Sequence, residues 1–302
     1  MDTLLYWVAR VVIIALQALP LRCVARLGRM GGLLAYAFDG RHRRVTLRNL
    51  TMCFGAEKSP NEIRALAREN FKRIGENYAC AIKTNAMSLE QLRPHVEVIG
   101  GEKVRDMMAV NPQQNTVAAI GHFGNFELYA RYGQFVPPVK CATTYRGLKQ
   151  PALNRLMQSL REKSGCLFFE RRTEGDKLRA AMNQGGILLG LLADQHPGGR
   201  GTPQSFLGRE CLHSTAPAVF ALRYNARLVT MICFRIGLAQ WRIEVGPEIS
   251  TQESGQPRPV EAITGDMVRA LEAAVRRDPA NWFWVHNRWK PLPEAARRQA
   301  VA

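Results

Sequence analysis

Short apolar runs alternate with longer stretches of helical periodicity along most of this chain. The apolar runs are typical of buried strands and lie at residues 117–121, 187–193 and 228–234. Helical spacing of apolar positions marks residues 61–84, 150–164, 177–183, 216–224 and 260–277. Residues 240–246 predict an edge strand, and the polar stretch 250–259 predicts a loop. This alternation predicts an α/β fold with a mostly parallel central sheet flanked by helices.

The amino-terminal segment has the composition of a membrane-associated helix. Residues 4–21 are apolar except for Arg10, Gln17 and Pro20, and they are about as many as a bilayer-spanning helix requires. Arg10 and Gln17 would share one face of a helix, which favours either a span with a polar seam or a helix lying in the interface. A buried core helix is the alternative. With no internal repeat, the simplest division is a membrane anchor at residues 1–25 and one domain at residues 26–302.

Composition and charge narrow the classes of partner. The chain has 302 residues, of which 46% are hydrophobic, so it can bury a sizeable core and disorder is excluded. Its 42 Lys and Arg against 25 Asp and Glu leave a formal charge of +17. This charge favours nucleic acid, anionic lipid headgroups, phosphorylated sugars or acidic carrier proteins as partners. An arginine-preferring genome would produce the same bias without any function. Arginines that follow the apolar segment predict that the rest of the chain stays on the cytoplasmic side of a membrane.

Cysteine and histidine spacing argues against several kinds of site. The seven cysteines form no C-x-x-C pair, and an odd number cannot all pair internally, so a reducing compartment is indicated. His196 and His213 with Asp194 do not follow a known metal-ligand spacing, and no metal site is predicted. The absence of a G-x-S-x-G sequence argues against a serine esterase of the α/β-hydrolase type.

The candidate chemistry lies in the sequence IGHFGNFELYARYGQF, residues 120–135. His122 and Glu127 are five residues apart, which would place them roughly 140° apart on a continuous helix. They therefore meet only across a turn. Gly124 permits a bend after the predicted strand, Asn125 is a favourable N-cap, and Glu127 falls in the first turn of the next helix.

This arrangement predicts a histidine–carboxylate dyad. Glu127 would accept a hydrogen bond from one imidazole nitrogen of His122, leaving the other nitrogen to take a proton from a hydroxyl. Amides at the start of the helix, around Gly124 and Asn125, would stabilise an oxyanion formed at an attacked carbonyl. A structural histidine at the end of a strand is the alternative interpretation.

Five segments carry a resemblance to a known family. GHFGNFE (121–127) resembles the H-x-x-x-x-[DE] signature of the glycerolipid and lysophospholipid acyltransferase superfamily, in the form typical of bacterial lipid A biosynthesis acyltransferases of the Kdo2-lipid A lauroyl/myristoyl type. Four other segments resemble blocks of this family in order: RRVTLRNLTMCFG (43–55), TTYRGLKQPALNRLM (143–157), GILLGLLADQHPGGRGTPQSFLG (186–208) and NWFWVHNRWK (281–290). The departures are Phe126, where the family often has tryptophan, and the FLG ending of the third of these blocks, which replaces a frequent double phenylalanine.

The resemblance implies transfer of a fatty acyl chain from an acyl carrier protein or coenzyme A thioester to a hydroxyl of a lipid A precursor or related glycolipid. It makes His122 the general base and Glu127 its partner, in an enzyme that needs neither cofactor nor metal. The resemblance implies Arg146 and Arg171 as substrate-binding residues. The other candidates are Gly124 and Asn125, from the amides at the helix start, and Asp194 and Gln195, which follow a predicted strand at the edge where ligands bind. An ordinary charged surface explains Arg171 equally well, and an acidic turn residue explains Asp194. The implied location is the cell inner membrane, with the acyltransferase domain (26–302) on the cytoplasmic side.

The carboxyl-terminal sequence supports a competing interpretation. Trp282, Trp284, Arg288, Trp289 and Lys290 mix aromatic and cationic side chains, a combination that stacks bases and contacts phosphate in nucleic-acid-binding modules. The same residues would suit a membrane interface, or they would pack in the core. A non-catalytic basic protein that binds membrane or nucleic acid is thus the alternative function, although the family resemblance leads us to expect no nucleic acid partner. That alternative requires no His122–Glu127 pair.

Overall fold

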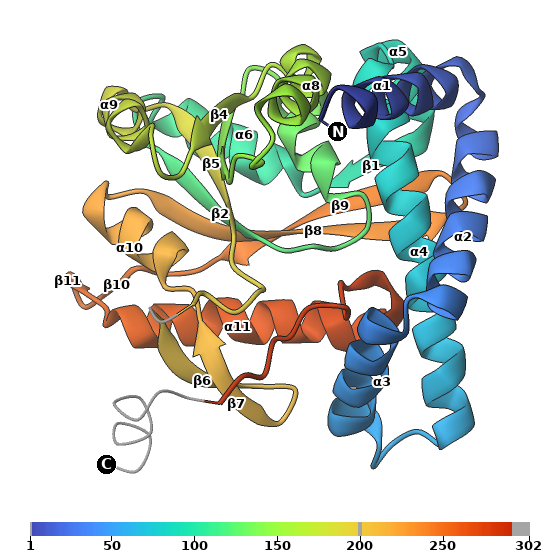
Figure 1. The fold of residues 1–302 in the computed structure, drawn as a ribbon. Helices are drawn as coiled ribbons and strands as arrows, with labels where there is room; N and C mark the ends of the chain where they lie inside the picture. The colour runs from blue at the N-terminus through green and yellow to red at the C-terminus, as the bar shows by residue number, and fades with distance from the viewer. Residues whose placement is uncertain (1, 199–200, 292–302) are drawn as a thin grey trace.

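A seven-stranded sheet forms the centre of the computed structural model, which describes residues 2–198 and 201–291 (Figure 1). Its strand order is β1-β9-β8-β2-β5-β3-β4, and within it β8 and β9 are antiparallel whereas the other neighbours are parallel. The strands are β1 (Val96–Ile99), β2 (Thr116–Ile120), β3 (Lys140–Tyr145), β4 (Leu167–Glu170), β5 (Ile187–Leu192), β8 (Arg227–Gly237) and β9 (Gln240–Glu248). Two hairpins lie outside the sheet: β6 (Thr202–Phe206) with β7 (Arg209–His213), and β10 (Gln252–Glu253) with β11 (Gln256–Pro257). The predicted α/β class and the mostly parallel sheet are confirmed.

Helices cover both faces of the sheet and one of its ends. In Figure 1, α6 lies above the sheet, α10 and α11 lie below it, and α2, α3 and α4 stand together at the right. The α-helices are α1 (Asp2–Ala18), α2 (Leu21–Phe38), α3 (Gly40–Phe54), α4 (Pro60–Ala86), α5 (Leu89–Leu92), α6 (Gly101–Val110), α7 (Tyr132–Phe135), α8 (Pro151–Arg161), α9 (Gly175–Gln184), α10 (Ala216–Arg223) and α11 (Val260–Arg277). Short 3₁₀ turns are η1 (Arg93–His95), η2 (Phe126–Arg131), η3 (Glu162–Ser164) and η4 (Pro279–Asn281).

The three predicted strands form the middle of the sheet because both of their faces are buried. Every residue of β2 is buried: Ala118 and Ile120 pack in one hydrophobic cluster, and Val117 and Ala119 pack in another on the opposite face. Successive side chains of a strand point to opposite faces, so a two-sided core requires the continuous apolar run found here. All five helices predicted from periodicity are also present, as α4, α8, α9, α10 and α11.

One predicted position in the sheet was wrong, and several elements were not predicted. Residues 240–246 do form a strand, but β9 is not at the edge, because β1 pairs with it in parallel register. The predicted loop at residues 250–259 contains the small β10–β11 hairpin. The strands β1, β3 and β4 were not predicted from the sequence. Exposed or half-buried positions interrupt their apolar pattern, as expected for strands at or near the two edges of the sheet.

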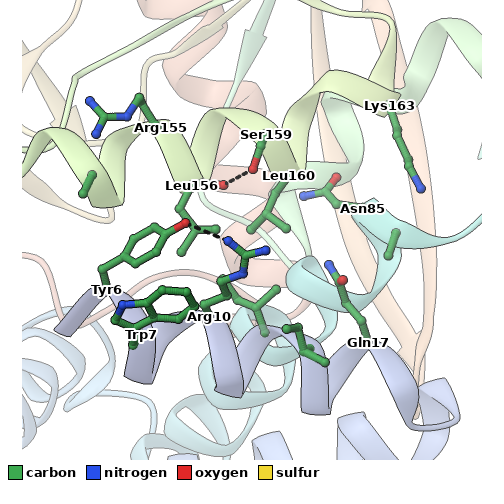
Figure 2. Close-up of a pocket in the computed structure, with 14 residues that line it drawn as sticks. Tyr6, Trp7, Arg10, Gln17, Asn85, Arg155, Leu156, Ser159, Leu160 and Lys163 are labelled. Atoms are coloured by element: carbon green, nitrogen blue, oxygen red, sulfur yellow. Dashed lines mark hydrogen bonds between the residues drawn. The ribbon is translucent and has the colours of Figure 1, made fainter. Parts of the chain in front are cut away.

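The amino-terminal segment forms two helices instead of one. The first helix ends at Ala18 and α2 begins at Leu21, so the expected boundary between residues 25 and 26 falls inside α2. Within residues 2–198 and 201–291, no helix is both long enough and apolar enough to cross a bilayer. The expectation that Arg10 and Gln17 share a face is confirmed: both line a groove between α1 and α8 (Figure 2).

Glycines let α2 and α4 approach each other closely. A Cβ atom on Gly75 of α4 would lie 2.1 Å from the carbonyl oxygen of Gly28 on α2, and one on Gly32 would lie 2.1 Å from the carbonyl oxygen of Phe71. Both distances are far shorter than van der Waals contact. The two backbones therefore touch, and any side chain at these positions would force the helices apart.

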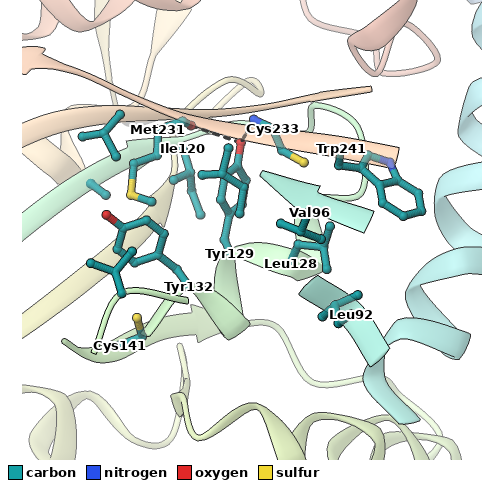
Figure 3. Close-up of a cluster of buried hydrophobic side chains, with 14 of the residues drawn as sticks. Leu92, Val96, Ile120, Leu128, Tyr129, Tyr132, Cys141, Met231, Cys233 and Trp241 are labelled. Atoms are coloured by element: carbon teal, nitrogen blue, oxygen red, sulfur yellow. Dashed lines mark hydrogen bonds between the residues drawn. The ribbon is translucent and has the colours of Figure 1, made fainter. Parts of the chain in front are cut away.

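Tyr129 ties the segment after β2 to the sheet (Figure 3). Its hydroxyl donates to the carbonyl oxygen of Met231 at 3.0 Å and accepts from the amide of Cys233 at 2.8 Å, both on β8. The ladder between β2 and β8 ends at Ile120 and Met231, so the tyrosine satisfies backbone groups that β2 no longer reaches. Burial raises the pKa of Tyr129 well above its usual range, which keeps this hydroxyl protonated. The segment that carries His122 and Glu127 is thereby fixed against the sheet.

Candidate functional site

The candidate residues gather at the carboxyl ends of four neighbouring parallel strands. His122 follows β2, Asp194 follows β5, Arg146 follows β3 and Arg171 follows β4. Parallel strands end at the same edge of a sheet, where loops from several strands form the usual ligand site of open α/β folds. Four sequence blocks that are far apart in the chain are thus brought to one edge.

A buried carboxylate holds the imidazole of His122. Asp194 accepts from Nδ1 of His122 at 2.9 Å and from the His122 backbone amide at 2.8 Å. The indole Nε1 of Trp282 donates to the same carboxylate at 2.9 Å. The Asp194 side chain is 1% exposed, so its charge is satisfied by these three donors and not by water.

The pKa of Asp194 reflects two opposed effects. Burial by itself would raise the pKa of this carboxyl group, but the nearby His122 charge and the donated hydrogen bonds outweigh it and hold the pKa at about 2. Asp194 is consequently an anion at neutral pH. An ionised carboxylate can only accept, so Nδ1 of His122 carries a proton and Nε2 of a neutral ring has a free lone pair.

Aromatic rings fix the imidazole from its other sides. The ring centroid of Phe126 lies 4.9 Å from that of His122, and the centroid of Phe283 lies 5.7 Å away. The His122 side chain is 16% exposed and lines a large cleft. No hydrogen bond joins Nε2 to another group of the described chain. This is the geometry of a histidine that is held rigidly and presents one nitrogen to a ligand.

Glu127 has a different partner from the one expected. It forms a two-point ion pair with Arg161 of α8, whose Nε and Nη2 donate to it at 3.1 and 2.7 Å. The predicted hydrogen bond between Glu127 and His122 is not among those of the described residues, because Asp194 occupies Nδ1. Both Glu127 and His122 nevertheless line the same cleft. The two side chains thus share one cleft, but the predicted contact between them is wrong.

The prediction that the backbone amide of Gly124 binds an oxyanion is wrong. Its backbone N–H donates to the carbonyl oxygen of Asn281 at 3.2 Å and is not free. Gly124 does make the predicted bend, with a φ of 50°, but it packs against Cys233. Asn125 is 1% exposed, its side-chain amide donates to Thr84 at 3.3 Å, and it makes no side-chain cap. Neither residue lines the cleft.

The cleft itself is large and predominantly basic. Its cavity volume is about 1240 Å³. The charged residues that line it are the cations Arg146, Arg161, Arg171, Arg172, Arg179, Arg223 and Lys290 and the acids Glu127, Glu170 and Glu174. This excess of cations favours an anionic ligand, and arginine is suited to bidentate contact with phosphate or carboxylate.

The predicted substrate-binding residues divide into two groups. Arg146, Arg171 and Gln195 line the cleft, and the two arginines are exposed. Asp194 was expected to face a ligand, but its burial and its bond to His122 exclude direct contact. In the loop that begins at Asp194, Gly199 and Arg200 lie outside the described residues.

The carboxyl-terminal tryptophans do not form a stacking surface. Trp282 and Trp284 are 1% and 0% exposed, so neither can stack on a base. Arg288 is also fully buried, where it donates to the carbonyl oxygen of Leu212 at 3.0 Å and contacts His213. Burial and the Arg288 charge lower the pKa of His213 to about 2, so this histidine is neutral. Core packing explains these residues, and the nucleic-acid interpretation loses its main support.

Two residues of the site were not identified from the sequence. Arg161 holds Glu127 from a helix whose charged residues look like an ordinary solvated face. Trp282 supplies the third hydrogen bond to Asp194, whereas its sequence context left base stacking, a membrane interface and core packing open. Both contacts join segments far apart in the chain, with separations of 34 and 88 residues. The TTYRGLKQPALNRLM block ends four residues before Arg161. Its resemblance to the family was therefore the signal in the sequence that lay nearest to Arg161.

Comparison with known proteins gives a consistent result. Residues 1–291 match the family model described as bacterial lipid A biosynthesis acyltransferase. The chain is 26% identical over 296 residues to the lipid A biosynthesis lauroyltransferase of Escherichia coli K12, with 96% of this chain and 92% of that protein covered. It is 23% identical over 285 residues to the lipid A biosynthesis palmitoleoyltransferase of Escherichia coli K12 and equally to a lipid A biosynthesis acyltransferase of Shigella flexneri, with 91% of this chain and 87% of each protein covered.

Proposed function

Because the chain belongs to the bacterial lipid A biosynthesis acyltransferase family, we propose that it transfers a fatty acyl chain to a hydroxyl of a lipid A precursor or related glycolipid. The donor is a thioester of acyl carrier protein or coenzyme A. The observation that carries this proposal is the match of residues 1–291 to the family together with the position of His122 at the head of the basic cleft.

His122 acts as the general base in this proposal. Its Nδ1 proton is directed to Asp194, so Nε2 is the nitrogen that removes the proton of the acceptor hydroxyl. The acceptor oxygen then bonds to the thioester carbonyl carbon, and the carbon–sulfur bond breaks. The departing thiolate takes the proton from the imidazolium, which restores neutral His122 and leaves an ester and a free thiol.

Two carboxylates stabilise the imidazolium that forms in this reaction. Asp194 acts by direct contact, fixing the tautomer and the orientation of the ring. Glu127 acts from the cleft, where the two hydrogen bonds from Arg161 hold its carboxylate in place. The predicted dyad thus becomes a histidine with a buried positioning aspartate and a cleft-facing glutamate.

The cleft cations bind the acceptor. Arg146, Arg171 and Lys290 line the cleft, are exposed, and form no ion pair with another described residue. Unpaired guanidinium and ammonium groups are available for the phosphates of a glycolipid. Gln195, next to Asp194 in the chain, adds a side-chain amide to the same wall.

The first two helices attach the protein to the cytoplasmic face of the inner membrane. The exposed apolar residues of α1 are Leu4, Leu5, Trp7, Val8, Val11, Val12 and Ile14. Those of α2 are Leu27, Met30, Leu33, Leu34 and Phe38. A helix with an extended apolar face and neighbouring arginines, here Arg22 and Arg26, suits the boundary between headgroups and acyl chains.

Replacement of His122 by alanine tests the reaction. We expect His122→Ala to lower acyl transfer by roughly 10²–10⁴-fold, the usual cost of losing a general base, while the protein still folds. Its unfolding transition should be lower than that of the wild type, because the buried carboxylate of Asp194 loses one of its three donors. The assay mixes purified protein with acyl-carrier-protein and coenzyme A thioesters and a lipid A precursor, and identifies the product by mass spectrometry. His42→Ala, at an exposed histidine on α3, is the matched control. A folded His122→Ala protein with the original rate would refute the mechanism.

A further inference from the structure

A second groove lies between α1 and α8, apart from the cleft that contains His122 (Figure 2). Its cavity volume is about 790 Å³, within the range of sites that bind small organic molecules. The apolar wall on α1 includes Trp7 and Ile14, and the facing wall on α8 includes Leu156 and Leu160. Trp7 and Ile14 are also part of the exposed apolar surface of α1, so the groove is continuous with that surface.

The charged residues of this groove all have the same sign. Arg10, Arg155 and Lys163 line it, and no aspartate or glutamate does among the side chains that the structure describes. None of the three forms an ion pair with a described side chain of residues 4–198 and 201–291. Arg10 donates to the hydroxyl of Tyr6 at 3.1 Å and lies 5.5 Å from the centroid of the Trp7 ring. The groove therefore combines an apolar wall with unpaired positive charge.

We infer that this groove binds one anionic phospholipid, with its acyl chain against Leu156 and Leu160, its phosphate at Arg10, and Arg155 and Lys163 adding positive charge toward the two ends of α8. The apolar wall favours a hydrocarbon occupant, and the exposed cations of one sign favour an anionic group beside it. A membrane phospholipid supplies both in one molecule. The exposed face of α1 supplies the route of entry from a bilayer.

Helix α8 separates this lipid groove from the cleft. Leu156 and Leu160 face the groove, whereas Met157 and Arg161 line the cleft. No residue of α8 is fully buried, so the helix is held by its half-buried side chains alone. A lipid against Leu156 and Leu160 adds contacts that steady α8 and, through Arg161, the position of Glu127. This last link rests on the proposed function, whereas lipid binding itself does not.

Photo-crosslinking tests the lipid site directly. Full-length protein is mixed with phosphatidylcholine vesicles containing a small fraction of phosphatidylglycerol with a photoreactive acyl chain, and the adducts are mapped by mass spectrometry. We expect adducts on α8 at Leu156 and Leu160, competed by excess phosphatidylglycerol and not by phosphatidylcholine or glycerol phosphate. Arg155→Ala with Lys163→Ala should reduce the yield roughly tenfold or more. Lys103→Ala with Arg105→Ala, exposed on α6, removes the same charge elsewhere and should leave it unchanged.

A second variant removes the space without changing the charge. Ser159 lines the groove and donates only to the Leu156 carbonyl of its own helix, at 2.8 Å, so Ser159→Trp fills the groove while Ser159→Ala serves as control. Ser159→Trp should abolish the adducts and remove the several-fold difference in acyl-transfer rate between phosphatidylglycerol and phosphatidylcholine vesicles that we expect for the wild type.

Three results would overturn the lipid site. They are equal competition by phosphatidylcholine and phosphatidylglycerol, an unchanged yield in the Arg155/Lys163 variant, and loss of the adducts when acyl donor or glycolipid acceptor is added, which would assign the groove to the substrates. Adducts that appear as expected on a protein without any acyl-transfer activity would instead refute the proposed function and leave the lipid site standing.

Discussion

Asp194 is an anion with almost no access to water. Its replacement by asparagine separates its role in orienting His122 from the effect of its negative charge. Asp194→Asn keeps the size of the side chain but cannot stabilise an imidazolium, and it can hold the other tautomer of His122. We expect acyl transfer to fall by about 10²–10⁴-fold with the fold preserved, as in related triads. The measurement is the turnover rate at saturating thioester, beside near-ultraviolet circular dichroism as the check on packing. Unaltered turnover would remove Asp194 from the mechanism.

The same residue predicts a pH dependence of stability. Its pKa in the folded protein, about 2, lies below the ordinary value of 3.8. Ionised Asp194 therefore stabilises the folded protein fully at pH values above its ordinary pKa. This contribution is lost as the pH falls from about 4 to about 2, and its size is roughly 2 kcal/mol. The free energy of unfolding should therefore decline more steeply over this window for the wild type than for Asp194→Asn. Parallel profiles would contradict the low pKa.

Glu127 and Arg161 should behave as one unit. Glu127→Ala leaves a half-buried guanidinium without its partner, and Arg161→Ala leaves the carboxylate free to turn away from the cleft. The double variant should thus cost about as much activity as the worse single one, which a double-mutant cycle measures. Glu127→Asp should retain partial activity and Glu127→Gln should retain less. Additive losses would mean that the two side chains act separately.

At this scale the sequence identified positions better than contacts. The turn after β2, with glycine in the left-handed region at residue 124, follows from local chemistry, and so does the placement of His122 and Glu127 beside it. The partner of His122 is 72 residues away and depends on which strands become neighbours in the sheet. Spacing within one segment contains no such information, so the nearer carboxylate was assigned to the histidine incorrectly.

At the scale of elements, the contact between α2 and α4 depends on having no side chain at Gly75. Gly75→Ala places a methyl group 2.1 Å from a backbone oxygen, and we expect a loss of several kcal/mol because the helices must separate. Gly31→Ala on the exposed face of α2 meets nothing within 4 Å and should be neutral or stabilising by up to about 1 kcal/mol. Chemical denaturation of both variants makes the comparison. Equal stabilities would show that the helices can slide apart freely.

The elements that were predicted correctly are those whose environment is uniform along their length. Residues of β2 are buried on both faces and those of α11 alternate regularly between core and solvent, so the hydrophobic pattern identifies each one. The residues of β4 are half-buried or exposed throughout and follow neither pattern. Its place in the sheet is set by pairing with β3, a tertiary contact that no local pattern records.

At the scale of the whole molecule, attachment to membranes should depend on the outer faces of α1 and α2. Leu34→Asp with Phe38→Asp puts charge at positions 58% and 84% exposed, and we expect binding to phosphatidylglycerol vesicles to fall at least tenfold. Val110→Asp with Ile236→Asp, at apolar positions on other exposed surfaces, is the control. Sedimentation with vesicles at low and high salt separates the apolar contribution to binding from the electrostatic one, because salt screens only the electrostatic contribution. Equal binding by both variants would argue against this surface.

Removing residues 1–25 is a poorer test of the same idea. Such a deletion takes away Leu21, Val24 and Ala25, which are buried against the rest of the protein. Sequence composition suggested a detachable anchor because apolar character continues through residue 21. The structure instead uses the second part of this segment as core, so point substitutions separate membrane binding from folding where truncation does not.

The bond from Trp282 to Asp194 has a consequence for the timing of activity during synthesis. All seven strands of the sheet precede this tryptophan in the chain, as do His122, Glu127 and the arginines of the cleft. A nascent chain on the ribosome can therefore assemble most of the fold while the carboxylate behind His122 still lacks one of its three donors. Chains that terminate before residue 282 would lack this donor, and the site behind His122 is completed only when one of the last segments of the protein has folded into place.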